Sequence, residues 1–338
     1  MRGRGRGRRR PALPARAGYA RARLAGVLAR SRSSRWLRRA VALALAGALA
    51  ACAGQPNEPD VVTVGVGSTT EQRLLAALTV VALEEAGLNT EIAPDLGGMV
   101  GVRREALRDA IDVYWDYTAS AWAQGLHQQN PPADPQESFE RVQEADRDRN
   151  DLVWLEPSEA NATLALFVDP EALDEQQSPT MDWLAGELSG QQRTLCVDPA
   201  FRDRRGGLRD LAEVYPMDLN RVRVREASEK EAIAGVAAGR CLAGLATATS
   251  GSAYAEGLVR VRDNLSVLPA FVVAPVAREA ALAHTPRIAD ALKPVTELLD
   301  TSTLARLNAA AQQAETASER QDLARRELAG HLEGLGDG

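Results

Sequence analysis

The chain has 338 residues, 45% hydrophobic and 25% charged, which is enough for two domains with well-buried cores. Its formal net charge of −6 is unevenly distributed: residues 1–51 contain 14 arginines and no acidic residue, which leaves 26 basic against 46 acidic side chains on the rest. An acidic body disfavours DNA, RNA or anionic lipid as a partner, and a basic N-terminus in front of it is typical of a targeting segment.

Residues 1–51 have the layout of a signal peptide. A positively charged flank precedes the apolar run Ala40–Ala51, which has about half of the ~20 residues needed to span a bilayer. The run ends in Leu-Ala-Ala followed by Cys52, which resembles the bacterial lipobox and implies cleavage before Cys52 and its diacylation. An ordinary cleavage site with an incidental cysteine is the alternative. We therefore expect a lipoprotein signal peptide over 1–51, a tether over 52–60, and an exported protein anchored to the outer face of the cell membrane by its lipid alone.

From residue 61 onward, the sequence predicts alternating strands and helices. Val61–Val66 is a predicted strand, and Ser68 with Glu71 fits a capping box that starts a helix ending at Gly87. Asn89–Ala93 is the next predicted strand. This rhythm indicates a parallel sheet with helices on its faces.

The segment Leu96–Trp122 has the features of a ligand site. Gly97-Gly98 permits backbone angles closed to other residues, so this loop can approach a ligand closely. Asp116-Tyr117-Thr118 falls where a buried strand ends and a helix begins. In open α/β sheets, ligands bind outside the carboxyl ends of strands, and a helix N-terminus there offers unpaired N–H groups. This stretch is predicted to be one wall of a small-molecule site.

The rest of the chain repeats the α/β rhythm. Further strands are predicted at 152–155, 164–168, 194–197, 222–224, 242–246, 258–262 and 272–276. Further helices are predicted after the N-cap Asp134, at 208–215, after a capping box of Ser228 and Glu231, and at 286–299, 302–314 (capped by Ser302) and 317–332. The predicted fold class is α/β.

Cysteines and histidines are sparse. In an exported protein, Cys196 and Cys241 can form a disulfide, and two buried thiols are the alternative. The three histidines lie far apart, without metal-ligand spacing, and leave no convincing Ser-His-Asp triad. We expect no metal site, no cofactor and no catalytic residues.

Seven short motifs occur along residues 61–316, and their order is as informative as their residues. They are Thr70-Glu71-Gln72, Leu96-Gly97-Gly98, Ile111–Thr118, Leu152–Pro157 with Asn161 and Thr163, Phe201 with Arg204 and Gly207, Ala274–Val276 with Arg278, and Leu298–Asn308. The ordered set resembles the substrate-binding proteins of glycine betaine/choline/carnitine ABC importers, the quaternary ammonium osmoprotectant family. The resemblance implies a type II periplasmic-binding-protein fold: two α/β lobes joined by two crossovers, with the ligand between them. Lobe 1 would be residues 61–160 plus 270–338, and lobe 2 residues 161–269.

The resemblance also implies a box of aromatic faces for a cation and an arginine for the carboxylate of a zwitterion. At the matching positions, Tyr117 and Phe271 would supply rings and Arg204 the anion partner, whereas Leu164 and Thr247 stand where the family has aromatic residues. The other candidate ligand-binding residues are Thr70, Gly98, Met99, Thr118, Asn161 and Thr249, with Trp115 or Trp122 as substitute rings.

These observations predict a lipid-anchored solute-binding component of an ABC importer that binds a quaternary ammonium or similar zwitterion. We expect it to be a monomer that works with a permease and its ATPase. Three alternatives stay open. The first is the same fold binding an amino acid, polyol or other polar solute, and the second is a sensor or adhesion lipoprotein without transport. The third is an enzyme, for which Asp112 and Asp116 are paired carboxylates without a partner base.

Overall fold

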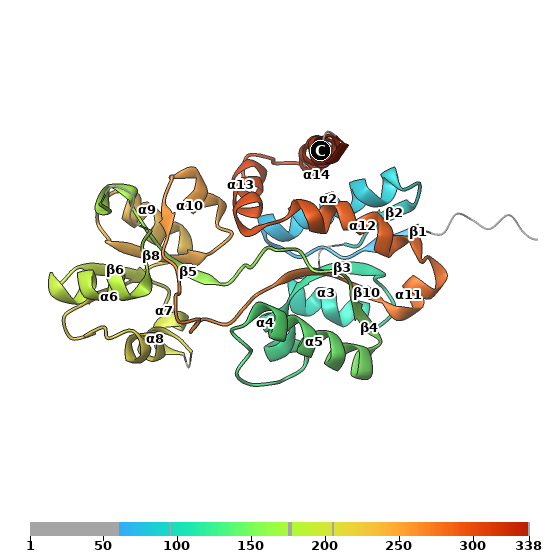
Figure 1. The fold of residues 1–338 in the computed structure, drawn as a ribbon. Helices are drawn as coiled ribbons and strands as arrows, with labels where there is room; N and C mark the ends of the chain where they lie inside the picture. Colours follow the sequence, from blue (N-terminus) through green and yellow to red (C-terminus); the bar gives the residue numbers. More distant parts are fainter. Residues whose placement is uncertain (1–60, 95, 175–177, 205, 337–338) are drawn as a thin grey trace, which may run out of the picture. The chain divides into compact units, whose positions relative to one another are not determined.

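A computed structural model describes residues 61–336 apart from residues 95, 175–177 and 205. The predicted signal peptide, the tether and Cys52 lie outside the described residues. Within this part of the chain, the strands form two five-stranded mixed sheets, and two crossover segments connect them (Figure 1). No helix in this part is both long and apolar enough to cross a membrane.

The first sheet draws its strands from both ends of the described chain. Its order is β2-β1-β3-β10-β4, in which β1 is parallel to β2 and β3, and β10 is antiparallel to β3 and β4. The strands are β1 (Val61–Val64), β2 (Asn89–Ile92), β3 (Val113–Tyr117), β4 (Leu152–Trp154) and β10 (Val273–Arg278). All five residues of β3 are buried, as expected of a central strand covered on both faces.

Helices cover both faces of the first sheet (Figure 1). They are α2 (Thr70–Glu85), α3 (Met99–Ala106), α4 (Thr118–Ser120), the π-helical η1 (Ala121–Gly125), α5 (Pro135–Asn150), α11 (Glu279–His284), α12 (Arg287–Leu298), α13 (Thr301–Ala311) and α14 (Ala317–Gly336). One apolar core joins α2, α12, α13 and α14 to the sheet, and a second core joins α3 and α5 to it.

The second sheet has the order β7-β6-β8-β5-β9. Its strands are β5 (Leu164–Val168), β6 (Thr194–Val197), β7 (Arg223–Glu226), β8 (Ala243–Thr247) and β9 (Val259–Arg260). Its helices are the 3-10 turn η2 (Pro170–Ala172), α6 (Met181–Gly190), α7 (Pro199–Asp203), α8 (Leu208–Val214), α9 (Glu229–Ala237) and α10 (Gly251–Ala255). The apolar sides of α6 and α8 share one core, and α9 and α10 pack in others.

The chain passes between the sheets after β4 and again before β10. The two crossover segments touch through an antiparallel bridge between Asn161 and Val272. The strands of the first sheet all fall within the range predicted for lobe 1, and those of the second within lobe 2. The residue boundaries of the lobes stay a prediction.

The cap of α2 differs from the prediction by one residue. The sequence suggests a capping box of Ser68 and Glu71, but the structure forms it from Thr69 and Gln72, through two hydrogen bonds of 3.2 Å. Both pairs have the same spacing, and only the neighbouring structure decides between them. The carboxylate of Glu71 is therefore available for contacts away from the helix end.

At other helices, the observed N-caps are compared with the predicted ones as follows: two agree and one differs. The capping box of Ser228 and Glu231 at α9 and the N-cap Asp134 at α5 are confirmed. At α13 the N-cap is Asp300 rather than Ser302, because the Asp300 carboxylate accepts the Ser302 backbone N–H at 2.7 Å. A side chain that reaches two N–H groups takes the cap position from a nearby serine.

Helices α6 and α11 are not predicted from the sequence. Helix α6 contains Gly186 and Gly190, which lower its intrinsic helix propensity. It is stabilised by burying Met181, Leu184 and Leu188 in the core of the second sheet. Tertiary packing, and not local preference, is what forms this helix.

A disulfide joins Cys196 at β6 to Cys241, which lies between α9 and β8, and the two Cα atoms are 6.0 Å apart. Helix α9 passes over the bond at Gly235, where an added Cβ would lie 2.7 Å from the Cys241 sulfur. The bond therefore fixes α9, whose first residue is Glu229, against the second sheet.

Removing this disulfide is expected to lower the free energy of unfolding by about 2–4 kcal/mol, because the bond closes a loop between cysteines 45 residues apart in the sequence. Urea unfolding of a Cys196→Ala/Cys241→Ala variant would measure the loss. Reductant should destabilise the parent protein by a similar amount and leave the variant unchanged. Equal stability of the two proteins would contradict the expectation.

Candidate ligand-binding site

A cavity of about 660 Å³ is lined by residues that follow strands of both sheets. Ser68–Gln72 come after β1, Tyr117 ends β3, and Thr247 ends β8. These positions are the carboxyl ends of their strands, where ligands of α/β sheets bind. Gly97–Val100 and Phe271 add to the lining from the first sheet and its loops.

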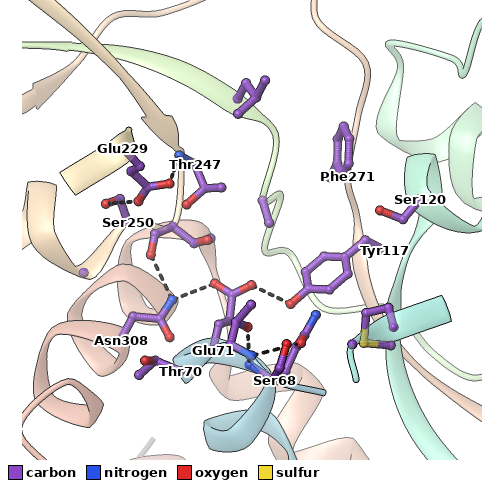
Figure 2. A pocket seen from close by; sticks show the side chains of 18 of the residues that line it. Ser68, Thr70, Glu71, Tyr117, Ser120, Glu229, Thr247, Ser250, Phe271 and Asn308 are labelled. Carbon is purple, nitrogen blue, oxygen red and sulfur yellow. Dashed lines mark hydrogen bonds between the residues drawn. The ribbon is translucent and has the colours of Figure 1, made fainter. Parts of the chain in front are cut away.

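Tyr117 is held between the first sheet and α2. Its backbone pairs with Val273 in β10, and its side chain is only 8% exposed. The phenol donates a hydrogen bond of 2.7 Å to a carboxylate oxygen of Glu71, so the ring has a fixed orientation beside the cavity (Figure 2). A fixed aromatic face is suited to a cationic ligand group.

Glu71 lines the cavity but is not among the predicted ligand-binding residues, because its spacing from Ser68 predicts a role in the helix cap. Its second carboxylate oxygen accepts a 2.6 Å hydrogen bond from the Asn308 amide of α13. The same amide donates to the Thr249 carbonyl at 2.9 Å, which links α2, α13 and the turn after β8 (Figure 2). Burial raises the pKa of the Glu71 carboxyl, although the hydrogen bonds from Tyr117 and Asn308 oppose the shift. Glu71 and Asn308 both lie in motifs that carry the family resemblance, and these motifs are the sequence signal that could have identified them as site residues.

The residues lining the cavity on the side of the second sheet are mostly polar. Leu164 and Thr247 are register partners on β5 and β8, so the two positions that lack the expected aromatic rings are neighbours on one wall. Beside them, the Glu229 carboxylate accepts hydrogen bonds from the Ser250 hydroxyl at 2.7 Å and the Thr247 N–H at 3.3 Å (Figure 2). Glu229 is a second lining residue that was not predicted.

Arg204 also lines the cavity, directly after α7. Its side chain is exposed, and its guanidinium carbon lies 5.7 Å from the centre of the Phe201 ring. The structure thus brings Tyr117, Phe271 and Arg204 to one cavity. The sequence predicts that the first two supply aromatic rings and that Arg204 supplies the partner for an anion. Of the other candidates, Thr70, Gly98, Met99 and Thr249 also line it.

Thr118 and Asn161 are not among the lining residues, which corrects their predicted placement. The Thr118 hydroxyl is buried, donates to the Ala270 carbonyl at 3.0 Å and accepts the Val272 N–H at 3.1 Å. The Asn161 side-chain oxygen accepts the Phe271 N–H at 2.8 Å. Both side chains are occupied by backbone groups of the second crossover and hold Phe271 in place from behind.

Trp115 and Trp122 do not supply substitute rings. The Trp115 indole is buried in the first sheet and donates to the Thr79 hydroxyl at 2.7 Å. The Trp122 indole donates to the Gln129 carbonyl at 3.0 Å. Neither residue lines the cavity, so the described lining contains no aromatic side chain besides Tyr117 and Phe271.

A buried ionic cluster supports β3 behind Tyr117. The Arg103 guanidinium forms two hydrogen bonds with the Asp146 carboxylate and lies 3.6 Å from that of Asp116. Asp116 also accepts the Tyr117 N–H at 2.8 Å, and burial raises the pKa of Asp116 to about 6. Asp112 is paired instead with Arg278 at 2.6 Å. The paired carboxylates that an enzyme would use are therefore structural ion pairs.

Comparisons with known proteins identify the family. The family model described as the substrate binding domain of an ABC-type glycine betaine transport system matches residues 60–326. The glycine betaine-binding protein YehZ of Escherichia coli is 30% identical over 73% of this chain and 84% of its own. A glycine-betaine-binding protein of Pseudomonas aeruginosa is 28% identical over 80% of this chain and 88% of its own.

Solved structures share the fold. Apo YehZ of Escherichia coli superposes with a TM-score of 0.72 at 26% identity, over 80% of this chain and 98% of that one. A glycine betaine/carnitine/choline ABC transporter structure gives 0.73 at 19% identity over the same shares. These likenesses confirm the predicted type II periplasmic-binding-protein fold. The matched family consists of transport proteins and not of enzymes, and its model covers most of this sequence. The chain belongs to the family of substrate-binding domains of ABC-type glycine betaine transport systems.

Proposed function

We propose that this protein is the lipid-anchored, extracytoplasmic solute-binding component of an ABC importer and binds a glycine betaine/choline-type quaternary ammonium in the cavity between its two lobes. The observation that carries the proposal is the meeting of Tyr117, Phe271 and Arg204 on one cavity. Rings attract the cation, and a guanidinium pairs with a carboxylate. The names of the relatives support the ligand class.

Export and anchoring rest on the sequence motif at Cys52. A monomer that delivers its ligand to a permease and its ATPase fits the family. Closure of the two lobes around the ligand would signal occupancy to the permease, as in other hinged binding proteins. Thr70, Gly98, Met99 and Thr249 are the proposed polar and backbone contacts beside the three principal residues.

The proposal predicts measurable but modest affinity. Leu164 and Thr247 remove rings from one wall, and each ring is worth about 0.5–2 kcal/mol, so binding should be roughly five- to a thousandfold weaker than in a complete cage. Calorimetry with glycine betaine, choline, carnitine and proline betaine tests this. An absence of heat from all four, with a thermal shift from a polyol or an amino acid, would overturn the ligand class.

One observation favours a second candidate, a different polar solute. The wall of the second sheet presents Thr247, Thr249 and Ser250 where rings are expected. Hydroxyl groups suit a polyol or an amino acid better than a quaternary ammonium. A sensor lipoprotein without transport would use the same site. Finding permease and ATPase genes beside this gene would argue against the sensor alternative.

A further inference from the structure

Helix α13 is in contact with helices of both sheets. Its Leu304, Leu307 and Ala311 are buried in the apolar core that joins α2 to the first sheet. Another face of the same helix lies against α10, which follows β8 of the second sheet (Figure 1). Helix α13 is therefore anchored in the core of the first sheet and presents a surface on which the helices of the second sheet rest.

The contact between α10 and α13 is made by the two backbones. Gly251, the buried first residue of α10, lies so close to α13 that an added Cβ would be 2.5 Å from the Ala309 nitrogen and 2.6 Å from the Asn308 carbonyl carbon. Real Cβ atoms essentially never come within 3.0 Å of such atoms, and the main chain of a packed helix cannot turn aside as a side chain can. Because no side chain separates the two backbones, this contact cannot become shorter.

Hydrogen bonds hold the contact on both sides of Gly251. The Asn308 side-chain amide donates to the Thr249 carbonyl at 2.9 Å, and the Gln312 side-chain amide donates to the Ser252 hydroxyl at 3.3 Å. Sliding of α10 along α13 would break both bonds, since a hydrogen bond is lost beyond about 3.5 Å. A rotation about the contact moves the bonded atoms much less and can keep both bonds.

Cavities lie on both sides of this contact. The ligand cavity is lined by Asn308 and Gln312 of α13. A second cavity of about 430 Å³ is lined by Thr301 and Ala305, which are nearer the start of the same helix. Ser250, directly before the first residue of α10, lines both cavities. A rotation of α10 and its sheet about the contact that narrows one cavity therefore widens the other.

We propose that the contact of Gly251 with α13 is the pivot about which the lobe of the second sheet rotates when the protein takes up its solute, and that the second cavity opens as the ligand cavity closes. The crossover segments, bridged at Asn161 and Val272, link the lobes elsewhere, and the pivot restricts the bending of these segments to a rotation. Gly251 is thus a positioning residue, because it sets the distance between the walls that a ligand must bridge. The inference rests on the proposed function only for the solute that drives the movement.

Gly251→Ala tests the pivot by titration calorimetry with glycine betaine. The added methyl group must move α10 roughly 1 Å away from α13 to reach ordinary van der Waals distance, which sets the walls of the ligand cavity further apart. We expect the affinity to fall roughly tenfold or more. If the movement breaks this contact instead of turning on it, the methyl group destabilises mainly the ligand-free form, and the affinity rises. An unchanged or higher affinity overturns the inference.

Gly186→Ala is the matched control. It adds the same methyl group to another helix of the second sheet, α6, where nothing lies within 4 Å of the new Cβ. The affinity of this variant should stay within about twofold of that of the parent protein. Circular dichroism checks that both variants are folded. Equal losses of affinity in the two variants would contradict a role for the Gly251 contact.

Distances between pairs of spin labels, measured by double electron–electron resonance, follow the rotation itself. One pair, Ala123→Cys with Asp203→Cys, places labels on exposed residues that adjoin the lining of the ligand cavity in the sequence. The other pair, Arg260→Cys with Ser302→Cys, uses exposed residues that line the second cavity. All variants carry Cys52→Ala so that only the chosen sites are labelled. Saturating glycine betaine should shorten the first distance and lengthen the second, and shortening of both or an unchanged second distance overturns the inference.

The pivot and the proposed ligand can fail separately. If glycine betaine gives no heat with the parent protein and changes neither distance, the proposed ligand is wrong. The pivot is then decided in the ligand-free protein, where Gly251→Ala should lengthen both label distances and Gly186→Ala neither. Unchanged distances in Gly251→Ala overturn the pivot, whichever solute the protein binds.

Discussion

Replacing Tyr117 with alanine is expected to weaken ligand binding by roughly ten- to a hundredfold. The change removes one of the two rings in the described lining and also the phenol that donates to Glu71 at 2.7 Å. It therefore loses the attraction of the ring for a cation and leaves a carboxylate oxygen without a partner. Titration calorimetry of the variant with choline or glycine betaine measures the loss, and circular dichroism checks that the fold is retained.

Tyr117→Phe is the matched control, because it keeps the ring and removes only the hydroxyl. We expect its affinity to remain within about threefold of the parent protein, since in the proposed binding mode the ring, and not the hydroxyl, faces the cation. If phenylalanine costs as much as alanine, the Glu71 contact and not the aromatic face determines binding. Full affinity in the alanine variant would favour the polyol or amino acid alternative.

Asp146→Ala is expected to lower the free energy of unfolding by about 3–5 kcal/mol. Arg103 is buried, and its two hydrogen bonds to Asp146 are its closest charge contacts. The indole of Trp154 also donates to Asp146 at 2.7 Å. Removing this carboxylate leaves a buried guanidinium with only the more distant Asp116 as counter-charge.

Urea unfolding at pH 7.5 is the appropriate measurement, because Asp116, with a pKa of about 6, is then ionised in the folded protein. Asp148→Ala changes an exposed carboxylate on the same helix and should alter stability by no more than about 0.5 kcal/mol. Similar effects of the two substitutions would show that helix propensity, and not the buried cluster, accounts for the loss.

Much of the fold can be predicted from the sequence because its signals are local. The strand Leu164–Val168 follows from a short continuous run of apolar residues, and the capping box at Ser228 follows from helix-cap spacing. The positions of Tyr117, Arg204 and Phe271 follow from motifs in a characteristic order. Each of these signals is contained within a few neighbouring residues, so no knowledge of distant contacts is needed.

The partners of polar side chains could not be predicted in the same way. Asn161 and Thr118 have the residue types of ligand contacts, yet each bonds to the crossover around Phe271, more than 100 residues further along the chain. Glu71 has the spacing of a helix cap, yet it meets Asn308, 237 residues away in the sequence. A hydrogen bond depends on which groups the fold brings within about 3 Å, and spacing along the chain does not contain that distance.

The amino-acid sequence by itself determined the family, the α/β fold and the choice of Tyr117, Arg204 and Phe271, which line one cavity, because strand patterns and motif order are properties of the chain. Only the tertiary structure decided that Glu71 and Glu229 line the same cavity and that Asn308 holds Glu71 there. Which polar groups meet depends on distances between segments far apart in the sequence, and these distances exist only once the chain has packed.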